Sequence, residues 1–153
     1  MATSLSSTAC RRIIQRQMRE LQNQSFVVEV GPILEDIYHW HTTILGPPNS
    51  PFSGGKFVLN INFQPEHPLK APMVRFQTKI FHPNISSRSG GISMRILREY
   101  WTSSITMLNI EPILDEAHPD VADTAEMYKN DRAMYDSTAQ SWTELYAMER
   151  NFQ

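Results

Sequence analysis

The serine at position 93 is a candidate nucleophile. It lies in Gly91-Ile92-Ser93-Met94-Arg95, directly after a polar, loop-forming segment that begins at His82. A serine in the pattern Gly-x-Ser-x-Gly attacks acyl groups from a strained turn between a strand and a helix. Here arginine replaces the second glycine, and no such turn is predicted at this point. The segment therefore does not predict a serine hydrolase.

Other residues that commonly form sites are present without the required spacing. Only His39 and His41, of five histidines, share a strand face, and no cysteine or carboxylate accompanies them at metal-binding spacing. The run at Gly54-Gly55-Lys56 lacks the spacing of a phosphate-binding loop. Cys10 is the single cysteine, so this chain alone cannot build a disulfide framework or a cysteine-rich zinc site. We expect no metal and no cofactor.

Composition predicts an ordinary globular protein. Its 153 residues suit one domain, and a net charge of −2 creates no field that would favour nucleic acid or an anionic membrane. No apolar run approaches the roughly 18 residues that cross a bilayer, and the polar start lacks the apolar core of a signal peptide. We expect a flexible N-terminus over residues 1–8, one domain over residues 9–150, and a cytoplasmic and/or nuclear location.

An amphipathic helix is predicted over residues 9–22. One apolar stripe along it is formed by Cys10, Ile14, Met18 and Leu21. A separate ridge of arginines is either a solvated helix face or a docking surface for an acidic partner. The ridge consists of Arg12, Arg16 and Arg19, and Arg11 lies nearby.

Four strands are predicted to follow. Their expected ranges are 26–30, 36–45, 56–63 and 73–77. The first is expected to end at the turn Gly31-Pro32. One face of the second strand is expected to carry Tyr38, Trp40, Thr42 and Ile44. One face of the third is expected to carry Phe57, Leu59, Ile61 and Phe63. Short turns between successive strands predict an antiparallel meander with one packed face.

Two helices are predicted near the end of the chain, over residues 121–129 and 131–148. The residues expected on the packed side of the second are Tyr135, Ala139, Trp142, Leu145 and Tyr146. Because one helix precedes the sheet and others follow it, the predicted fold class is α+β.

Several short motifs occur in the order and at the spacing of one protein family. They are Tyr38-His39-Trp40, Ile44-Leu45-Gly46-Pro47, Ser50-Pro51-Phe52-Ser53-Gly54-Gly55, His67-Pro68-Leu69-Lys70-Ala71-Pro72, Lys79-Ile80-Phe81-His82-Pro83-Asn84-Ile85 and Tyr128-Lys129-Asn130-Asp131-Arg132. Over roughly residues 10–149 the chain resembles the core domain of ubiquitin-conjugating enzymes. The resemblance implies the UBC-like fold: an N-terminal helix, a four-stranded antiparallel meander and C-terminal helices. Pro112 and the short segment after Trp101 imply a shortened or broken crossover helix.

The resemblance also identifies the loop at His82-Pro83-Asn84 as the family's active-site loop. It implies that His82 holds the loop and that Asn84 occupies the former oxyanion position. Active members carry a cysteine a few residues later, which accepts ubiquitin as a thioester, and Ser93 stands there in this chain. A thiolate suits this chemistry because it is nucleophilic near neutral pH and leaves readily. Ser93 is therefore a degenerate nucleophile position, and no catalytic residue is expected.

The resemblance places partner-binding residues on the first helix and two loops. They are Arg12, Arg16, Leu69, Ser103 and Ser104. The implied partners are an active ubiquitin-conjugating enzyme, ubiquitin or a ubiquitin-like protein, and a RING or U-box ligase assembly. We expect a catalytically inactive variant that modulates transfer by binding. Two alternatives stay open: a weakly active enzyme that forms an oxyester at Ser93, and a structural interaction subunit.

Overall fold

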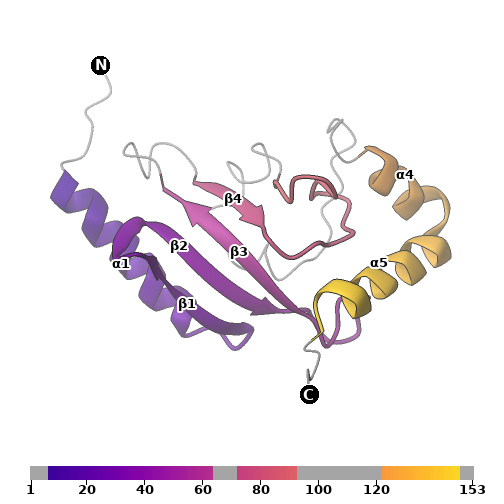
Figure 1. Ribbon diagram of the computed structural model, residues 1–153, viewed down its shortest axis with the longest axis horizontal. Coiled ribbons are helices and arrows are strands. Elements are labelled where there is room, and N and C mark those ends of the chain that lie inside the picture. The colour runs from indigo at the N-terminus through magenta and orange to yellow at the C-terminus, as the bar shows by residue number, and fades with distance from the viewer. Residues whose placement is uncertain (1–6, 64–71, 93–121, 149–153) are drawn as a thin grey trace.

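The computed structural model describes residues 7–63, 72–92 and 122–148 of the chain (Figure 1). One helix precedes four strands, and two helices follow them. The elements are α1 (Ser7–Gln22), β1 (Val27–Ile33), β2 (Asp36–Leu45), β3 (Lys56–Asn62), β4 (Met73–Phe76), α4 (Ala122–Asn130) and α5 (Arg132–Tyr146). The predicted α+β class is confirmed, and the first helix begins two residues earlier than expected.

The four strands form one antiparallel meander in the order β1-β2-β3-β4. Alternation along β2 and β3 buries one face of the sheet, as the sequence predicts. On this inner face lie the buried side chains of Trp40, Thr42, Ile44, Phe57, Leu59, Ile61, Val74 and Phe76. The opposite, outer face carries mostly polar side chains.

The predicted end of the first strand at Gly31-Pro32 is wrong. β1 continues through both residues to Ile33, with Pro32 opposite Trp40 of β2. β1 is an edge strand of the described sheet, where a missing N–H on the open side interrupts no ladder. The chain turns instead at Leu34 and Glu35, which both have positive φ angles of 52° and 65°. Two positive φ angles are typical of the tight two-residue turn that joins antiparallel strands.

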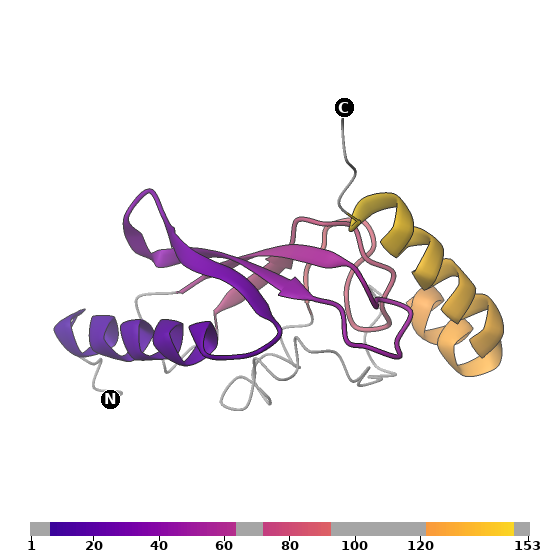
Figure 2. The same ribbon diagram turned by 90° about the horizontal axis from the view of Figure 1, so that it is seen from below.

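The predicted apolar stripe of α1 packs against the inner face of the sheet. Cys10, Ile14 and Leu21 are buried, and Met18 is partly buried against the same core as Trp40. Figures 1 and 2 show α1 beside β1 and β2 at one end of the molecule, and α4 and α5 at the other end. The two ends of the sheet are therefore covered by different helices.

Asp131 directly precedes α5 and caps it: its carboxylate accepts a hydrogen bond from the Met134 N–H at 3.1 Å. Tyr135, Ala139 and Thr143 are its buried residues, so the prediction holds for the first two. The prediction is wrong for Leu145, which is 54% exposed. At 3.6 residues per turn, this position lies about 120° from the centre of the buried stripe.

Tyr146 lies on the side of the buried stripe but is 46% exposed, because it is the last residue of the helix. Its ring contacts Trp142, with ring centroids 5.8 Å apart. The adjoining turn is tied to the sheet by a backbone hydrogen bond of 2.9 Å from the Lys56 N–H to the Ala147 carbonyl.

Candidate functional site

The segment from Ile80 to Ile92 returns along the free edge of β4. The Phe76 N–H donates to the Gly90 carbonyl at 2.8 Å, and the Ile92 N–H donates to the Val74 carbonyl at 3.3 Å. Arg75 and Gly91 form the bridge between these two hydrogen bonds. The end of the segment is thus fixed against the sheet, and Ser93 is the residue that follows it in the chain.

Backbone and hydroxyl hydrogen bonds also order the interior of this segment. The Ser86 N–H donates to the Gly91 carbonyl at 2.9 Å, and the Gly90 N–H donates to the Ser86 carbonyl at 2.8 Å. The Ser86 and Ser89 hydroxyl oxygens accept from the backbone N–H groups of Ser89 and Gly91. The serines at these positions therefore support a turn, as short polar side chains commonly do.

Gly90 is the position where this turn tolerates no side chain. Its φ angle is +76°, and a Cβ built there would lie 2.0 Å from the carbonyl oxygen of Phe76. Positive φ disfavours other residues, and the close backbone approach excludes them. The sequence shows a glycine pair here, but only the contact with β4 identifies which glycine is required.

His82 lies at the start of the segment and is 4% exposed. Its Nδ1 accepts a hydrogen bond from the Asn84 N–H at 3.0 Å, so the neutral ring carries its proton on Nε2. Burial lowers the pKa of His82 to about 3. The ring also packs on Phe52, with centroids 5.7 Å apart. His82 is therefore an uncharged side chain that holds the following turn, and it is a weak base.

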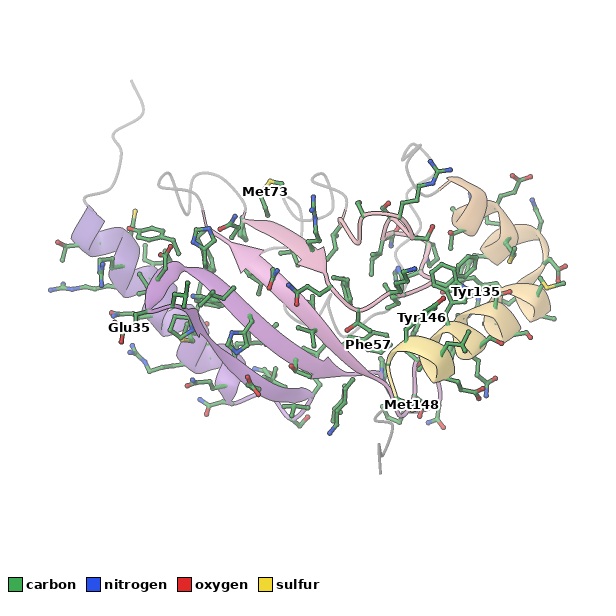
Figure 3. The ribbon with its side chains drawn as sticks, in the orientation of Figure 1. Glu35, Phe57, Met73, Tyr135, Tyr146 and Met148 are labelled. Atoms are coloured by element: carbon green, nitrogen blue, oxygen red, sulfur yellow. The ribbon has the colours of Figure 1, made fainter. Side chains whose placement is uncertain are left out.

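Pro83 and Asn84 complete the turn, and both are buried. The Asn84 side-chain oxygen accepts no hydrogen bond within the described part of the chain. Phe81 anchors the turn to α5, since its ring centroid lies 5.9 Å from that of Tyr135 and 5.2 Å from that of Trp142. Figure 3 shows Tyr135 on the side of α5 that faces this segment. The anchoring role of Phe81 was not predicted, because nothing in the sequence pairs it with a particular helix.

Arg12 and Arg16 lie apart from this loop, on the exposed side of α1. Arg16 approaches Glu20 at 3.8 Å, and both side chains are about two-thirds exposed, so the pair is weak. Within the described ranges, α1 packs against β1 and β2, whereas the loop contacts β4 and α5. The remaining predicted site residues, Leu69, Ser93, Ser103 and Ser104, lie outside the described residues, as do Trp101 and Pro112.

Two further observations concern the described residues only. They contain no group of three or more histidine, cysteine, aspartate or glutamate side chains that could hold a metal ion. No helix within residues 7–63, 72–92 and 122–148 has the length and apolar character needed to cross a membrane.

Comparison with known proteins agrees with this architecture. The family model described as ubiquitin-conjugating enzyme matches residues 12–143. Among solved structures, the chain is similar to the E2 domain of a ubiquitin conjugating enzyme from Toxoplasma gondii, with 32% sequence identity and a TM-score of 0.74. That match covers 90% of this chain and 98% of the Toxoplasma chain. The fold, the His82-Pro83-Asn84 turn and both matches give one conclusion: the chain belongs to the ubiquitin-conjugating enzyme family.

Proposed function

We propose that this protein is a catalytically inactive ubiquitin-conjugating enzyme variant. It modulates the transfer of ubiquitin or a ubiquitin-like protein by binding an active conjugating enzyme, a ligase or ubiquitin itself. The observation that carries the proposal is the position of its only thiol. Cys10 is 1% exposed and lies on α1, which packs against β1 and β2, whereas Ser93 follows the segment that is fixed against β4.

The chemistry of Ser93 supports the same proposal. A serine hydroxyl needs a general base to act as a nucleophile near neutral pH, whereas a cysteine is partly ionised there. His82 is the histidine that lies nearest to Ser93 along the chain, but it is buried, its Nδ1 accepts the Asn84 N–H, and its pKa is about 3. It cannot serve as an efficient base at neutral pH.

Binding remains possible where catalysis is absent, because the scaffold is independent of the nucleophile. The turn at residues 82–84 is held by internal hydrogen bonding and by aromatic contacts with α5. Arg12 and Arg16 present guanidinium groups on an exposed helix face, which suits an acidic partner surface. We assign partner binding to this face together with Leu69, Ser103 and Ser104.

A charging assay tests the proposal. The full chain is incubated with ubiquitin-activating enzyme, ubiquitin and ATP, and the products are separated with and without a thiol reductant. We expect no ubiquitin adduct, because no exposed thiol is available. An adduct that the reductant removes would overturn the proposal. An adduct that resists the reductant, is cleaved by hydroxide and disappears in Ser93→Ala would overturn it in favour of the oxyester-forming enzyme.

A binding assay tests the second half of the proposal. Immobilised full chain is exposed at low salt to ubiquitin, to active conjugating enzymes and to RING or U-box domains. At least one of these classes is expected to bind, and Arg12→Glu with Arg16→Glu is expected to weaken ligase binding by reversing the charge of the α1 face. If all three classes fail to bind, the structural-subunit alternative replaces the proposal.

A further inference from the structure

A cavity of about 420 Å³ lies between the loop that joins β2 to β3 and one side of α5. The loop contributes the side chains of Asn49, Ser50, Pro51 and Ser53. The helix contributes a row at positions 136, 140 and 144, and Met148 continues this row past the end of α5. Residues four apart project from the same side of a helix. Figure 1 shows the loop beside the C-terminal end of α5.

The loop side of the cavity is ordered by its own hydrogen bonds. The Ser50 hydroxyl donates to the Pro47 carbonyl at 2.7 Å and accepts from the Phe52 N–H at 3.2 Å. The hydrogen bond from the Lys56 N–H to the Ala147 carbonyl, 2.9 Å long, ties the end of the loop to the end of α5. A ligand would therefore enter a site whose walls are already in place, which lowers the cost of binding.

The charges that line the cavity are all of one sign. Among the described residues, its charged lining side chains are the carboxylates of Asp136 and Glu144. Asp136 has a partner, because the Arg132 Nε donates to its Oδ1 at 3.0 Å. Glu144 is exposed, and no cation of the described residues pairs with it. The cavity thus presents one shared carboxylate and one that lacks a counter-charge.

Glu144 also occupies an unfavourable position in its helix. The C-terminal end of a helix carries a partial negative charge, which favours basic side chains and disfavours acids. Glu144 lies in the last turn of α5, and that turn has no basic side chain. Lys79 is placed over the Tyr146 ring, with its Nζ 5.2 Å from the ring centroid. Residues two apart project about 200° apart on a helix, so Lys79 lies on the side away from Glu144. A cationic ligand would supply the charge that this end of α5 lacks.

The spacing of the two acids predicts the spacing of the cations that fit them. Asp136 and Glu144 are two positions of the row separated by Gln140, about 12 Å apart along the helix axis. In an extended chain, residues i and i+4 project on the same side and lie about 13 Å apart. Two basic residues at this spacing reach one carboxylate each, and the Gln140 carboxamide lies where it can bind the backbone between them.

The rest of the lining favours a peptide over a free polyamine. Arginine and lysine have apolar stems that can pack on Pro51 and Met148, and a guanidinium matches the two oxygens of a carboxylate. A polyamine carries similar charges, but it has no amide groups for Asn49 and Gln140 and must order many rotatable bonds.

We propose that this cavity binds an extended, basic segment of a partner protein, with arginine or lysine at positions i and i+4. One basic side chain pairs with Glu144, and the other shares Asp136 with Arg132. The ligand is opposite in charge to the acidic surface that suits Arg12 and Arg16 at the other end of the molecule. The inference does not depend on the chemistry of Ser93, so it stands or falls independently of the proposed function.

Two short peptides test the proposal on the full chain. The probe is a capped seven-residue peptide with arginine at its second and sixth positions and serine or alanine elsewhere. Its matched control has the same composition with the two arginines adjacent. In ¹H–¹⁵N spectra we expect the probe to shift the side-chain amide signals of Asn49 and Gln140. The control should bind about threefold more weakly or worse, and affinity for the probe should fall as salt rises.

Point variants make the test specific. Glu144→Gln should weaken probe binding by about threefold or more, and the two peptides should then bind within about 1.5-fold of each other, because only one carboxylate remains. Its melting temperature should stay the same or rise, since an acid is removed from the last turn of a helix. Glu126→Gln is the matched control: it removes the same charge from an exposed position on α4 that does not line the cavity, and it should change affinity by less than about 1.5-fold.

The proposal is overturned by any of four results. The peptide with adjacent arginines binds the native chain as tightly as the probe; Glu144→Gln behaves like Glu126→Gln; the probe leaves the signals of Asn49 and Gln140 unchanged; or spermidine binds the cavity as tightly as the probe, which would identify a polyamine site instead.

Discussion

The buried His82 predicts a specific dependence of stability on pH. Its pKa is about 3 in the folded protein because burial penalises the charged ring, whereas a histidine in the unfolded chain has a pKa near 6.5. Between these values the unfolded chain binds a proton that the folded protein does not. His82 therefore makes its full contribution to the free energy of unfolding above pH 6.5. This contribution falls as the pH drops below 6.5.

The size of this effect follows from the two pKa values. Each pH unit below the pKa of the unfolded chain lowers the free energy of unfolding by about 1.4 kcal/mol. Lowering the pH from 7.5 to 5 therefore lowers it by about 2 kcal/mol because of His82. Since pH 5 lies well above the folded pKa, the result hardly depends on its exact value. Asp36, whose pKa is lowered by the Tyr38 N–H and then by His39, loses its contribution only below about pH 4. The contribution of Asp36 is therefore constant between pH 7.5 and pH 5 and adds nothing to the change in unfolding free energy over this range.

Urea unfolding followed by tryptophan fluorescence measures this difference at pH 7.5 and pH 5. The control is His82→Asn, because the asparagine side-chain oxygen can accept the Asn84 N–H in place of Nδ1 but does not titrate. The native protein should lose about 2 kcal/mol more than the variant. If both lose the same amount within about 0.5 kcal/mol, His82 is not a buried neutral ring in solution, and the account of the loop is wrong.

Two further predictions concern the backbone of the scaffold. Gly90→Ala should cost about 2–4 kcal/mol of unfolding free energy, because it strains a positive φ and displaces the Phe76 backbone, while Gly91→Ala should cost under about 1 kcal/mol. Equal losses in urea unfolding would contradict the geometry of the turn. Asp131→Ala should lower the free energy of unfolding by about 1 kcal/mol, because it removes the acceptor of the Met134 N–H. Asp131→Asn keeps a side-chain oxygen and should retain most of this stabilisation. Thermal unfolding distinguishes these two variants.

The strands were predictable from the sequence because alternation reports directly which face is buried. The apolar positions of β3 from Phe57 to Ile61 repeat with a period of two and lie on the inner face as expected, and Phe63, directly after the strand, is also buried. The end of β1 was not predictable, because Gly31-Pro32 is compatible both with a turn and with an edge strand. Which strand forms the edge of the sheet depends on pairing between distant residues.

The candidate site was predictable in its position and less so in its construction. The motif at His82-Pro83-Asn84 locates the loop, but nothing in the sequence shows that Gly90 contacts the Phe76 carbonyl or that Phe81 packs on α5. That Asn60 and Arg75 lie directly opposite each other on β3 and β4 was not predicted, for the same reason. Those residues are distant in the chain, and only the register of β3 and β4 makes them neighbours.

The central claim is that the scaffold of a conjugating enzyme persists in this chain without its nucleophile. This can be tested by measuring the intact mass of the full chain and of Ser93→Cys after incubation with activating enzyme, ubiquitin and ATP. We expect that the native chain keeps its own mass, and that Ser93→Cys gains one ubiquitin that a thiol reductant removes. A reductant-sensitive ubiquitin adduct on the native chain would contradict it.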